Sequence, residues 1–224
     1  SILSGYFSYD IIRYIEKIPN STKNDLNIPD TRILRPKNLI IHDNVKKKLF
    51  YIVNLYNDEK INNLEKKFNK IKKQIEEMVF LSNYKVRNNE IKTIKNSKII
   101  SNISKKKFIN NVKKAKNYIK IGDIFQVVLS QRFETNLTKK PLEIYKKLRK
   151  TNPSPFMYFF NFDDFQIIGA SPEILVRLRN NKITIRPIAG TRPRGKNKKE
   201  DLFYEKDLLN DKKELSEHLM LLDL

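Results

Sequence analysis

The sequence predicts an α+β fold in which antiparallel β-sheets are flanked by helices. Two observations lead to this prediction. In the second half of the chain, short strand-like segments follow one another through tight polar turns at residues 163–164 and 180–181, and strands joined this closely pair antiparallel. Stretches with helical periodicity lie before and after these segments instead of alternating with each strand. The prediction is therefore not a doubly wound parallel sheet.

A β-hairpin and a helix are predicted in the first part of the chain. The apolar segments Leu39–His42 and Leu49–Leu55 are joined by a polar turn, as in a hairpin. Apolar residues then recur at steps of three and four from Ile61 to Met78, which predicts an amphipathic helix. A coiled coil would give the same pattern, but packing of a single helix on its own domain is favoured for so short a run. Residues 81–102 are rich in Asn and Lys and are interpreted as a linker.

The elements of the second half begin at Ser104, the predicted N-cap of a helix that ends at Gly122. The β-branched and aromatic content of residues 124–134 predicts a strand with an apolar core face and a polar face that carries Gln126. A strand with one side in water would show the same alternation. A short helix over Pro141–Lys150 follows, and after it we expect a four-stranded antiparallel meander up to residue 188.

The last predicted element is a helix with two different sides. Glu214, Glu217 and His218 share one side, and a carboxylate pair beside a histidine could hold a metal ion. An ordinary solvated helix face carries the same residue types. The opposite side is apolar and is expected to be buried; it consists of Leu215, Leu219 and Leu222.

Composition narrows the classes of function. Lys and Arg number 46 against 25 Asp and Glu, which gives a net charge of +21 and by itself suggests an anionic partner such as nucleic acid. The lysines are scattered among Asn and Ile, as in a chain from a low-GC genome, so a solvated surface is favoured over a basic nucleic-acid-binding module. The absence of cysteine excludes disulfides and thiolate chemistry and fits a cytoplasmic protein. GxGxxG, Walker, HExxH and GxSxG motifs are absent.

Five ordered motifs resemble one family. "AKNYIKIGDIFQVVLSQRF", "NPSPFMYFF", "GASPE", "PIAGTRPRG" and "ELSEHLMLLDL" are similar to the chorismate-utilising enzymes, most closely to the large synthase component of anthranilate synthase. The opening "GYFSYD" resembles the N-terminal domain of the same proteins. The resemblance implies that residues 1–58 end that domain, that 59–103 are a helix and linker, and that 104–224 begin the chorismate-binding domain. Because the chain starts without Met and stops within an apolar run, we expect it to be an internal fragment.

The resemblance implies a reaction and roles for several residues. In this family Mg²⁺ anchors the ring carboxylate of chorismate, ammonia adds to the ring as a hydroxyl leaves, and loss of pyruvate gives anthranilate. Glu217 would be one Mg²⁺ ligand. Glu173 would protonate the leaving hydroxyl. Gly190 and Thr191 would bind the substrate through backbone and hydroxyl donors.

The same loop carries positive charge, because Arg192, Arg194 and Lys196 follow Thr191. These side chains are expected to raise the local potential for a substrate with two carboxylates. The loop is therefore interpreted as an anion-binding segment, against the alternative of a charged surface hairpin.

Two positions separate the reactions within the family. Relatives that add water to chorismate, the isochorismate synthases, carry a lysine base where this chain has Gln126. Aminodeoxychorismate synthases commonly carry a nucleophilic lysine at the position of Ala189. Both residues favour anthranilate synthase, and the other two activities remain the alternatives.

The resemblance also implies regulation and a partner. Pro155, Phe156 and Met157 correspond to part of the tryptophan feedback site, although Phe156 replaces the usual Tyr, and a Pro-bounded core strand would explain the same residues. The implied partner is a glutamine amidotransferase subunit that delivers ammonia. The family's second Mg²⁺ glutamate and further substrate contacts follow the position of Leu224, so we expect the 224-residue chain alone to be inactive.

Overall fold

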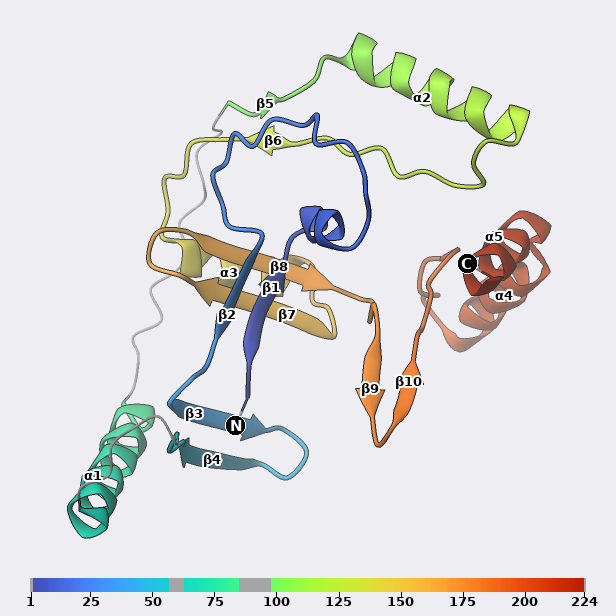
Figure 1. Ribbon diagram of the computed structural model, residues 1–224. Coiled ribbons are helices and arrows are strands. Elements are labelled where there is room, and N and C mark those ends of the chain that lie inside the picture. Colours follow the sequence, from blue (N-terminus) through green and yellow to red (C-terminus); the bar gives the residue numbers. More distant parts are fainter. Residues whose placement is uncertain (1, 57–62, 85–97, 224) are drawn as a thin grey trace. The chain divides into compact units, whose positions relative to one another are not determined.

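The computed structural model describes residues 2–56, 63–84 and 98–223 of the protein. The chain divides into two units, Ser1–Asn89 and Glu90–Leu224. Among the described residues, each sheet is an antiparallel pair of strands, and helices lie between some of these pairs and after the last one (Figure 1). The predicted α+β class is confirmed.

The first unit contains two hairpin-like pairs and one long helix. Its elements in chain order are β1 (Ser4–Phe7), the 3-10 helix η1 (Tyr9–Tyr14), β2 (Thr31–Leu34), β3 (Asn38–Asp43), β4 (Lys48–Val53) and α1 (Leu64–Ser82). β1 pairs with β2, and β3 pairs with β4 as predicted. The turn between β3 and β4 is closed by the Asp43 carboxylate, which accepts hydrogen bonds from the Val45 and Lys46 amides, both at 2.9 Å.

Helix α1 packs against β4 of the same unit. The hydroxyls of Tyr51 and Ser82 lie 2.5 Å apart and join the strand to the end of the helix. The Asn63 side chain caps the first turn by accepting from the Lys66 amide at 3.0 Å. The predicted helix is confirmed from Leu64 onward, whereas Ile61 lies outside the described residues.

The second unit contains the remaining elements. In chain order they are β5 (Ile100–Ser101), α2 (Lys105–Ile121), β6 (Phe133–Glu134), α3 (Pro141–Thr151), β7 (Phe156–Asn161), β8 (Gln166–Ser171), β9 (Arg177–Arg179), β10 (Lys182–Thr184), α4 (Lys198–Asn210) and α5 (Lys212–Asp223). The bounds of α2 follow from its caps, because the Ser104 hydroxyl accepts from the Lys107 amide at 3.2 Å and Gly122 adopts a left-handed φ of 84°. Both predicted helix ends are confirmed.

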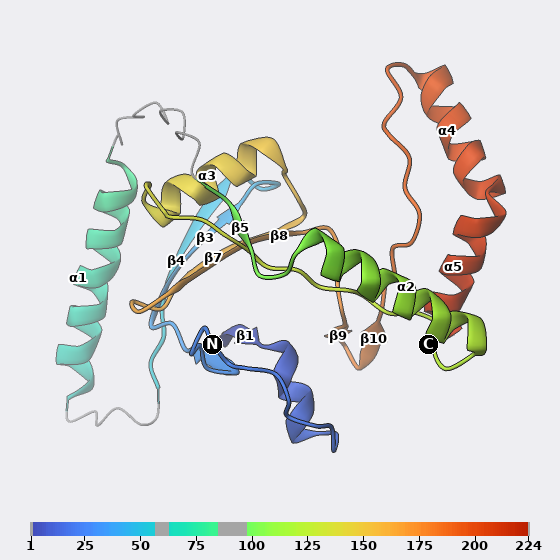
Figure 2. The same cartoon turned by 90° about the horizontal axis from the view of Figure 1, so that it is seen from above.

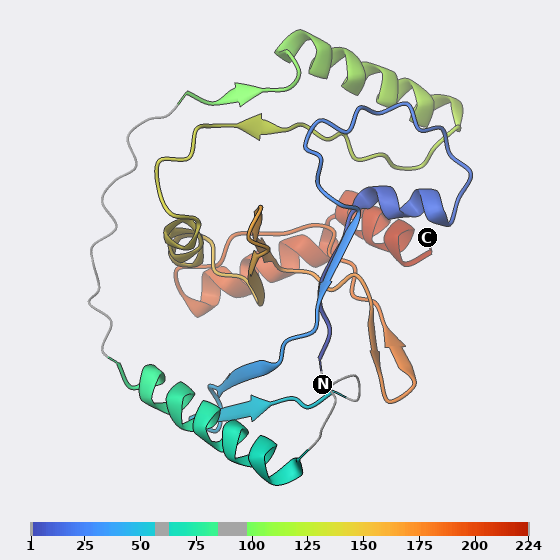
Figure 3. The same cartoon turned by 60° about the vertical axis from the view of Figure 1, so that its left-hand side comes forward.

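The predicted strand over residues 124–134 is mostly wrong. Figure 3 shows the chain leaving β5, passing through α2 and returning to β6, so the only pairing of this segment in the described residues is between the short strands β5 and β6. Residues 124–132 are not assigned to a strand. Strand propensity does not by itself form a ladder, because each strand needs a hydrogen-bonding neighbour. The expected core face is consequently exposed, including Phe125.

The predicted meander forms as two separate hairpins. β7 pairs with β8 in the register Phe156 to Ser171, and β9 pairs with β10 through Asn180 and Asn181, both at positive φ as a tight hairpin turn requires. β8 and β9 are not paired with each other. Helix α3 packs on the β7–β8 hairpin, with the rings of Tyr145 and Phe159 5.9 Å apart.

Many large apolar side chains in the described ranges are exposed, among them Phe125 before β6 and Leu175 after β8. Within the described ranges, the buried hydrophobic core consists of Phe162, at 6% exposure. No helix in those ranges combines the length and apolar character needed to cross a membrane.

Candidate active site

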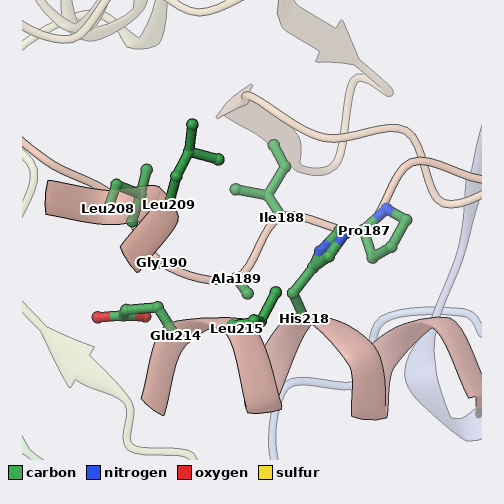
Figure 4. Close-up of a pocket in the computed structure, with 9 residues that line it drawn as sticks. All are labelled: Pro187, Ile188, Ala189, Gly190, Leu208, Leu209, Glu214, Leu215 and His218. Carbon is green, nitrogen blue, oxygen red and sulfur yellow. The ribbon is translucent and has the colours of Figure 1, made fainter. Parts of the chain in front are cut away.

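The loop between β10 and α4 carries the predicted anion-binding segment. Figure 2 shows this loop running back alongside α5 and α4 before it enters α4. Loop and helices enclose a cavity of about 310 Å³ (Figure 4). Its lining residues are Pro187, Ile188, Ala189, Gly190, Leu208, Leu209, Glu214, Leu215 and His218. His218 rises from α5 toward Pro187 in Figure 4, so one wall of the cavity is the helix that also carries Glu217.

Arg192 attaches the loop to both helices. Its Nε donates to Asp207 Oδ2 at 2.5 Å, its Nη2 to Asp211 Oδ2 at 2.7 Å, and its Nη1 to Glu214 Oε1 at 3.4 Å. The side chain is only 21% exposed. Hydrogen bonds from the guanidinium to Asp207 and then Asp211 raise the pKa of Arg192 above its ordinary value.

The end of the loop is held by the first turn of α4. Arg194 Nη1 donates to Asp201 Oδ2 at 2.8 Å, and the Gly195 amide donates to Asp201 Oδ1 at 2.8 Å. These two interactions, the amide first, lower the pKa of Asp201. The Lys196 amide donates to Glu200 Oε2 at 2.7 Å.

These ion pairs change the interpretation of the loop's charge. Arg192 and Arg194 were expected to raise the potential around an anionic substrate, but both guanidinium groups bind carboxylates of this unit. The charge of Arg192 is therefore largely offset within this unit, whereas Arg194 is 88% exposed and forms a surface ion pair with Asp201. Arg192 attaches the loop to α4 and α5, and Arg194 contacts the first turn of α4. The pairing carboxylates were missed in the sequence, although acidic residues recur soon after the basic loop. They are Asp201, Asp207, Asp211 and Glu214.

Gly190 lies directly against the Glu214 carboxylate. A Cβ atom at position 190 would overlap the Glu214 side chain, so either the carboxylate or the loop would have to shift. Thr191 follows and is exposed. The predicted substrate-binding pair is thus held next to α5 by contacts on both sides.

Helix α5 faces the loop with its polar side, opposite to the sequence prediction. Glu214, Glu217 and His218 are half-buried, whereas Leu215, Leu219 and Leu222 are 49%, 57% and 59% exposed. The prediction that the leucine side is buried was wrong, since Leu219 and Leu222 are exposed and Leu215, although half exposed, lines the cavity beside Glu214 and His218. Asp211 Oδ1 also accepts from the Glu214 and Lys213 amides and so begins the helix. The Glu214 amide first and Arg192 second lower the pKa of Asp211.

Glu173 lies just after β8 and contacts the same loop. Its Oε1 accepts from the Ile188 amide at 3.3 Å, and the Ser171 hydroxyl accepts from the Glu173 amide at 3.3 Å. Glu173 lines a second cavity of about 410 Å³. The other lining residues are Pro155, Phe156, Pro172, Ile174, Arg186, Pro187 and Ile188. The structure therefore brings Glu173 together with the start of the loop and with two residues predicted for feedback.

Other predicted site residues lie apart from the two cavities. Gln126 is exposed in the extended segment before β6. Met157 is half-buried in β7, where it pairs with Ala170, and is not among the lining residues of either cavity. Glu217 lies on the half-buried side of α5 but does not line either cavity. The described residues contain no cluster of three or more His, Cys, Asp or Glu side chains that could hold a metal ion.

Comparison with known proteins agrees with the motifs. The chorismate binding enzyme family matches residues 2–224. Anthranilate synthase component 1 of Acetivibrio thermocellus is 42% identical over 98% of this chain and 45% of the relative, and that of Aquifex aeolicus is 41% identical over 99% and 45%. The crystal structure of anthranilate synthase component I from Streptococcus pneumoniae TIGR4 matches with a TM-score of 0.84 and 33% identity, covering 99% of this chain and 48% of that one.

The chain thus spans about half the length of these relatives. The residues matched by the family include the loop, α5 and the segment around Glu173, which line the cavities described above. Because the family matches nearly every residue and the backbone follows a solved relative, the protein belongs to the chorismate binding enzymes.

Proposed function

We propose that this chain acts as part of an anthranilate synthase large subunit, which converts chorismate and ammonia to anthranilate and pyruvate at the first committed step of tryptophan biosynthesis. The similar proteins carry this name. The observation that carries the proposal is the course of the loop, which contacts Glu173 through the Ile188 amide and α5 through Gly190. One short segment thereby joins the proposed acid to the helix of the proposed metal ligand.

Each proposed role rests on the chemistry of the side chain. Glu173 delivers a proton to the leaving hydroxyl, because hydroxide is a poor leaving group without protonation. Gly190 and Thr191 supply donors to the substrate from a loop whose position is fixed by hydrogen bonds on both flanks. Fixed donors stabilise developing charge without having to reorganise during the reaction.

Glu217 is the proposed contribution of this chain to a Mg²⁺ site. Mg²⁺ is held in proteins by one or two carboxylates, with water and substrate filling the other positions, so the donor type fits. Glu214 is a weaker candidate because its Oε1 accepts from Arg192. The described residues offer no complete cluster, which limits this chain to a partial site. Bound Mg²⁺ would supply positive charge for the ring carboxylate of chorismate.

Two residues support amination of chorismate over the other reactions of the family. Ala189 lines the first cavity and offers no nucleophile there, in contrast to the lysine of aminodeoxychorismate synthases. The amide of Gln126 cannot serve as the base that activates water in isochorismate synthases. Ammonia is itself a nucleophile and needs no such base.

The proposal extends to regulation, a partner and domain organisation. Pro155, Phe156 and Met157 form part of a tryptophan-binding feedback site, and a glutamine amidotransferase subunit in the cytoplasm supplies ammonia. Residues 1–58 belong to the N-terminal domain of the subunit, 59–103 connect it, and 104–224 begin the chorismate-binding domain. The shared cavity of Phe156 and Glu173 supports regulation, because a ligand at Phe156 would lie next to the proposed acid.

The test replaces the matching region of the Acetivibrio thermocellus relative with this chain. The chimera is expected to form fluorescent anthranilate from chorismate, Mg²⁺ and ammonium, whereas the 224-residue chain alone is expected to form none. Glu173→Gln and Glu217→Gln should each lower the rate of the chimera by about a hundredfold or more. Glu77→Gln, on the exposed side of α1, serves as the matched control and should leave the rate unchanged.

The product that the chimera forms distinguishes anthranilate synthase from the two alternative synthases. A folded chimera that forms aminodeoxychorismate or isochorismate would replace the proposal with the corresponding synthase. A folded chimera that consumes no chorismate, or full activity of the Glu173→Gln variant, would contradict the proposed function and the proposed acid, respectively.

A further inference from the structure

We propose that Arg192 is the positioning residue of this site: it fixes the distance between the Gly190–Thr191 segment and the α5 carboxylate Glu217. This inference deepens the proposed function and rests on it for its catalytic meaning. The contacts themselves belong to the described chain and can be tested without chorismate.

Three carboxylates converge on the Arg192 guanidinium. Asp207 lies in the last turns of α4, Asp211 lies between the helices, and Glu214 lies in the first turn of α5. Arg192 donates to all three. The planar guanidinium presents donors in a rigid fork, so three acceptors are held in a defined arrangement that a lysine ammonium cannot reproduce.

The Arg192 guanidinium also binds the backbone of its own loop. Nη1 of Arg192 donates to the Thr191 carbonyl at 3.1 Å. This contact fixes the orientation of the peptide group that follows Thr191. The side chain that attaches the loop to the helices therefore also orients the segment proposed to bind substrate.

The two carboxylate oxygens of Asp211 accept hydrogen bonds from different parts of the chain. Its Oδ2 accepts from Arg192, whereas its Oδ1 accepts from the amides that begin α5. The loop and the start of the helix are thus attached to one carboxylate. Glu217 follows six residues later, about 9 Å along a rigid helix, so its distance from the loop is set at Asp211.

The Arg192 guanidinium also offsets the mutual repulsion of the three carboxylates that it binds. Without Arg192, the carboxylates of Asp207, Asp211 and Glu214 would be close to one another with their largest positive neighbour removed. Like charges at such short range repel, and Gly190 rests directly against one of them. We therefore expect the loop to separate from α5 when the guanidinium is lost.

The test measures amide hydrogen exchange in the 224-residue chain at Ile188 and Gly195, whose amides donate to Glu173 and Asp201 on either side of the Gly190–Thr191 segment. Arg192→Ala should accelerate exchange by on the order of tenfold, and Arg192→Lys should give an intermediate rate because it keeps the charge but not the fork. The matched control is Arg179→Ala, which removes an exposed arginine of β9 in the same unit. It should leave both amides at the rate of the unmodified chain, and the α2 amides should be unchanged in every variant.

A double-mutant cycle with Asp207→Asn makes the test specific. In the unmodified chain this substitution removes a partner of Arg192 and should accelerate exchange. In the Arg192→Ala background it removes one of three repelling carboxylates and should slow exchange. An unchanged rate in Arg192→Ala, or the same acceleration by Asp207→Asn in both backgrounds, would overturn the proposal.

The chimera then tests the catalytic meaning. Arg192→Ala should raise the KM for chorismate by on the order of tenfold while leaving the Mg²⁺ requirement unchanged, since Glu217 remains on α5, and Arg192→Lys should restore part of the loss. An unchanged KM would contradict positioning. If the unsubstituted chimera makes no anthranilate, the proposed function fails, whereas the exchange experiment still decides the role of Arg192.

Discussion

Asp211 illustrates how one side chain determines two local structures. Its folded-state pKa is lowered, so it contributes stability that is present above its ordinary pKa and is lost as the pH falls through the folded value. Asp201 behaves in the same way at the other end of α4. The loop, α4 and α5 should therefore be most stable at neutral pH and weaken in acid.

We accordingly predict that the α4–α5 region keeps its amide protection from neutral pH down to about pH 4 and loses it below, because protonated carboxylates no longer bind Arg192 and Arg194 as ions. Hydrogen exchange measured across this range checks the prediction. Asp211→Asn should reduce the acid dependence, and Asp123→Asn, outside this region, should not. Protection that persists unchanged to pH 2 would show that these ion pairs do not stabilise the region.

Gly190 gives a second prediction at a single residue. Gly190→Ala should displace the loop from Glu214, because the added methyl group would overlap the carboxylate. We expect the KM of the chimera for chorismate to rise by on the order of tenfold with little change in overall folding. Gly195→Ala is unsuitable as a control because its backbone also contacts Asp201 closely. Ala189→Gly, at the neighbouring position, should change the KM much less.

Part of the candidate site was predictable at the residue scale. The motifs singled out Glu173, Gly190, Thr191 and Glu217, whose roles stay predictions, and the structure shows that the loop lies against Glu173 and α5. The ion pairs of Arg192 were not predictable, because its partners lie 15 to 22 residues further along the chain and only the packing of two helices brings them together. The charges in the sequence alone suggested that the Arg192 side chain is available to an anionic substrate.

Elements were predicted well where their ends carry local signals. Helix α2 begins and ends at Ser104 and Gly122 because a side-chain cap and a left-handed glycine act within a few residues. The β9–β10 turn follows from two asparagines at positive φ for the same reason. The strand over residues 124–134 failed because its ladder depends on a distant neighbour, and residue pattern does not specify where that neighbour lies.

The N-cap of α2 leads to a prediction about the stability of the whole helix. Ser104→Ala removes the acceptor for the Lys107 amide and should destabilise the helix by about 1 kcal/mol. Ser104→Asp keeps an acceptor and adds a negative charge at the helix N-terminus, so it should retain the stability of the unmodified chain. Residue-resolved exchange of the first turn of α2 measures both effects. Equal protection in the Ala and Asp variants would show that the cap contributes nothing.

Both units leave most of their large apolar side chains accessible, and within the described ranges the buried hydrophobic core consists of Phe162. Because the denaturant m value scales with the area exposed on unfolding, we predict a urea m value well below that of compact proteins of equal length. Equilibrium urea unfolding followed by circular dichroism provides the measurement. An m value equal to that of compact proteins would mean that the chain buries more surface in solution.

The exposed leucines of α5 also bear on how long the protein persists in a cell. Chaperones and proteases act on chains that present apolar segments, and Leu219 and Leu222 are exposed one turn apart on a helix whose Glu214 is already paired with Arg192. Chaperones and proteases would therefore act on this helix as they act on an incompletely folded segment. Cellular abundance of the protein should depend on whether these leucines are covered, independently of how well the loop and its carboxylates are assembled.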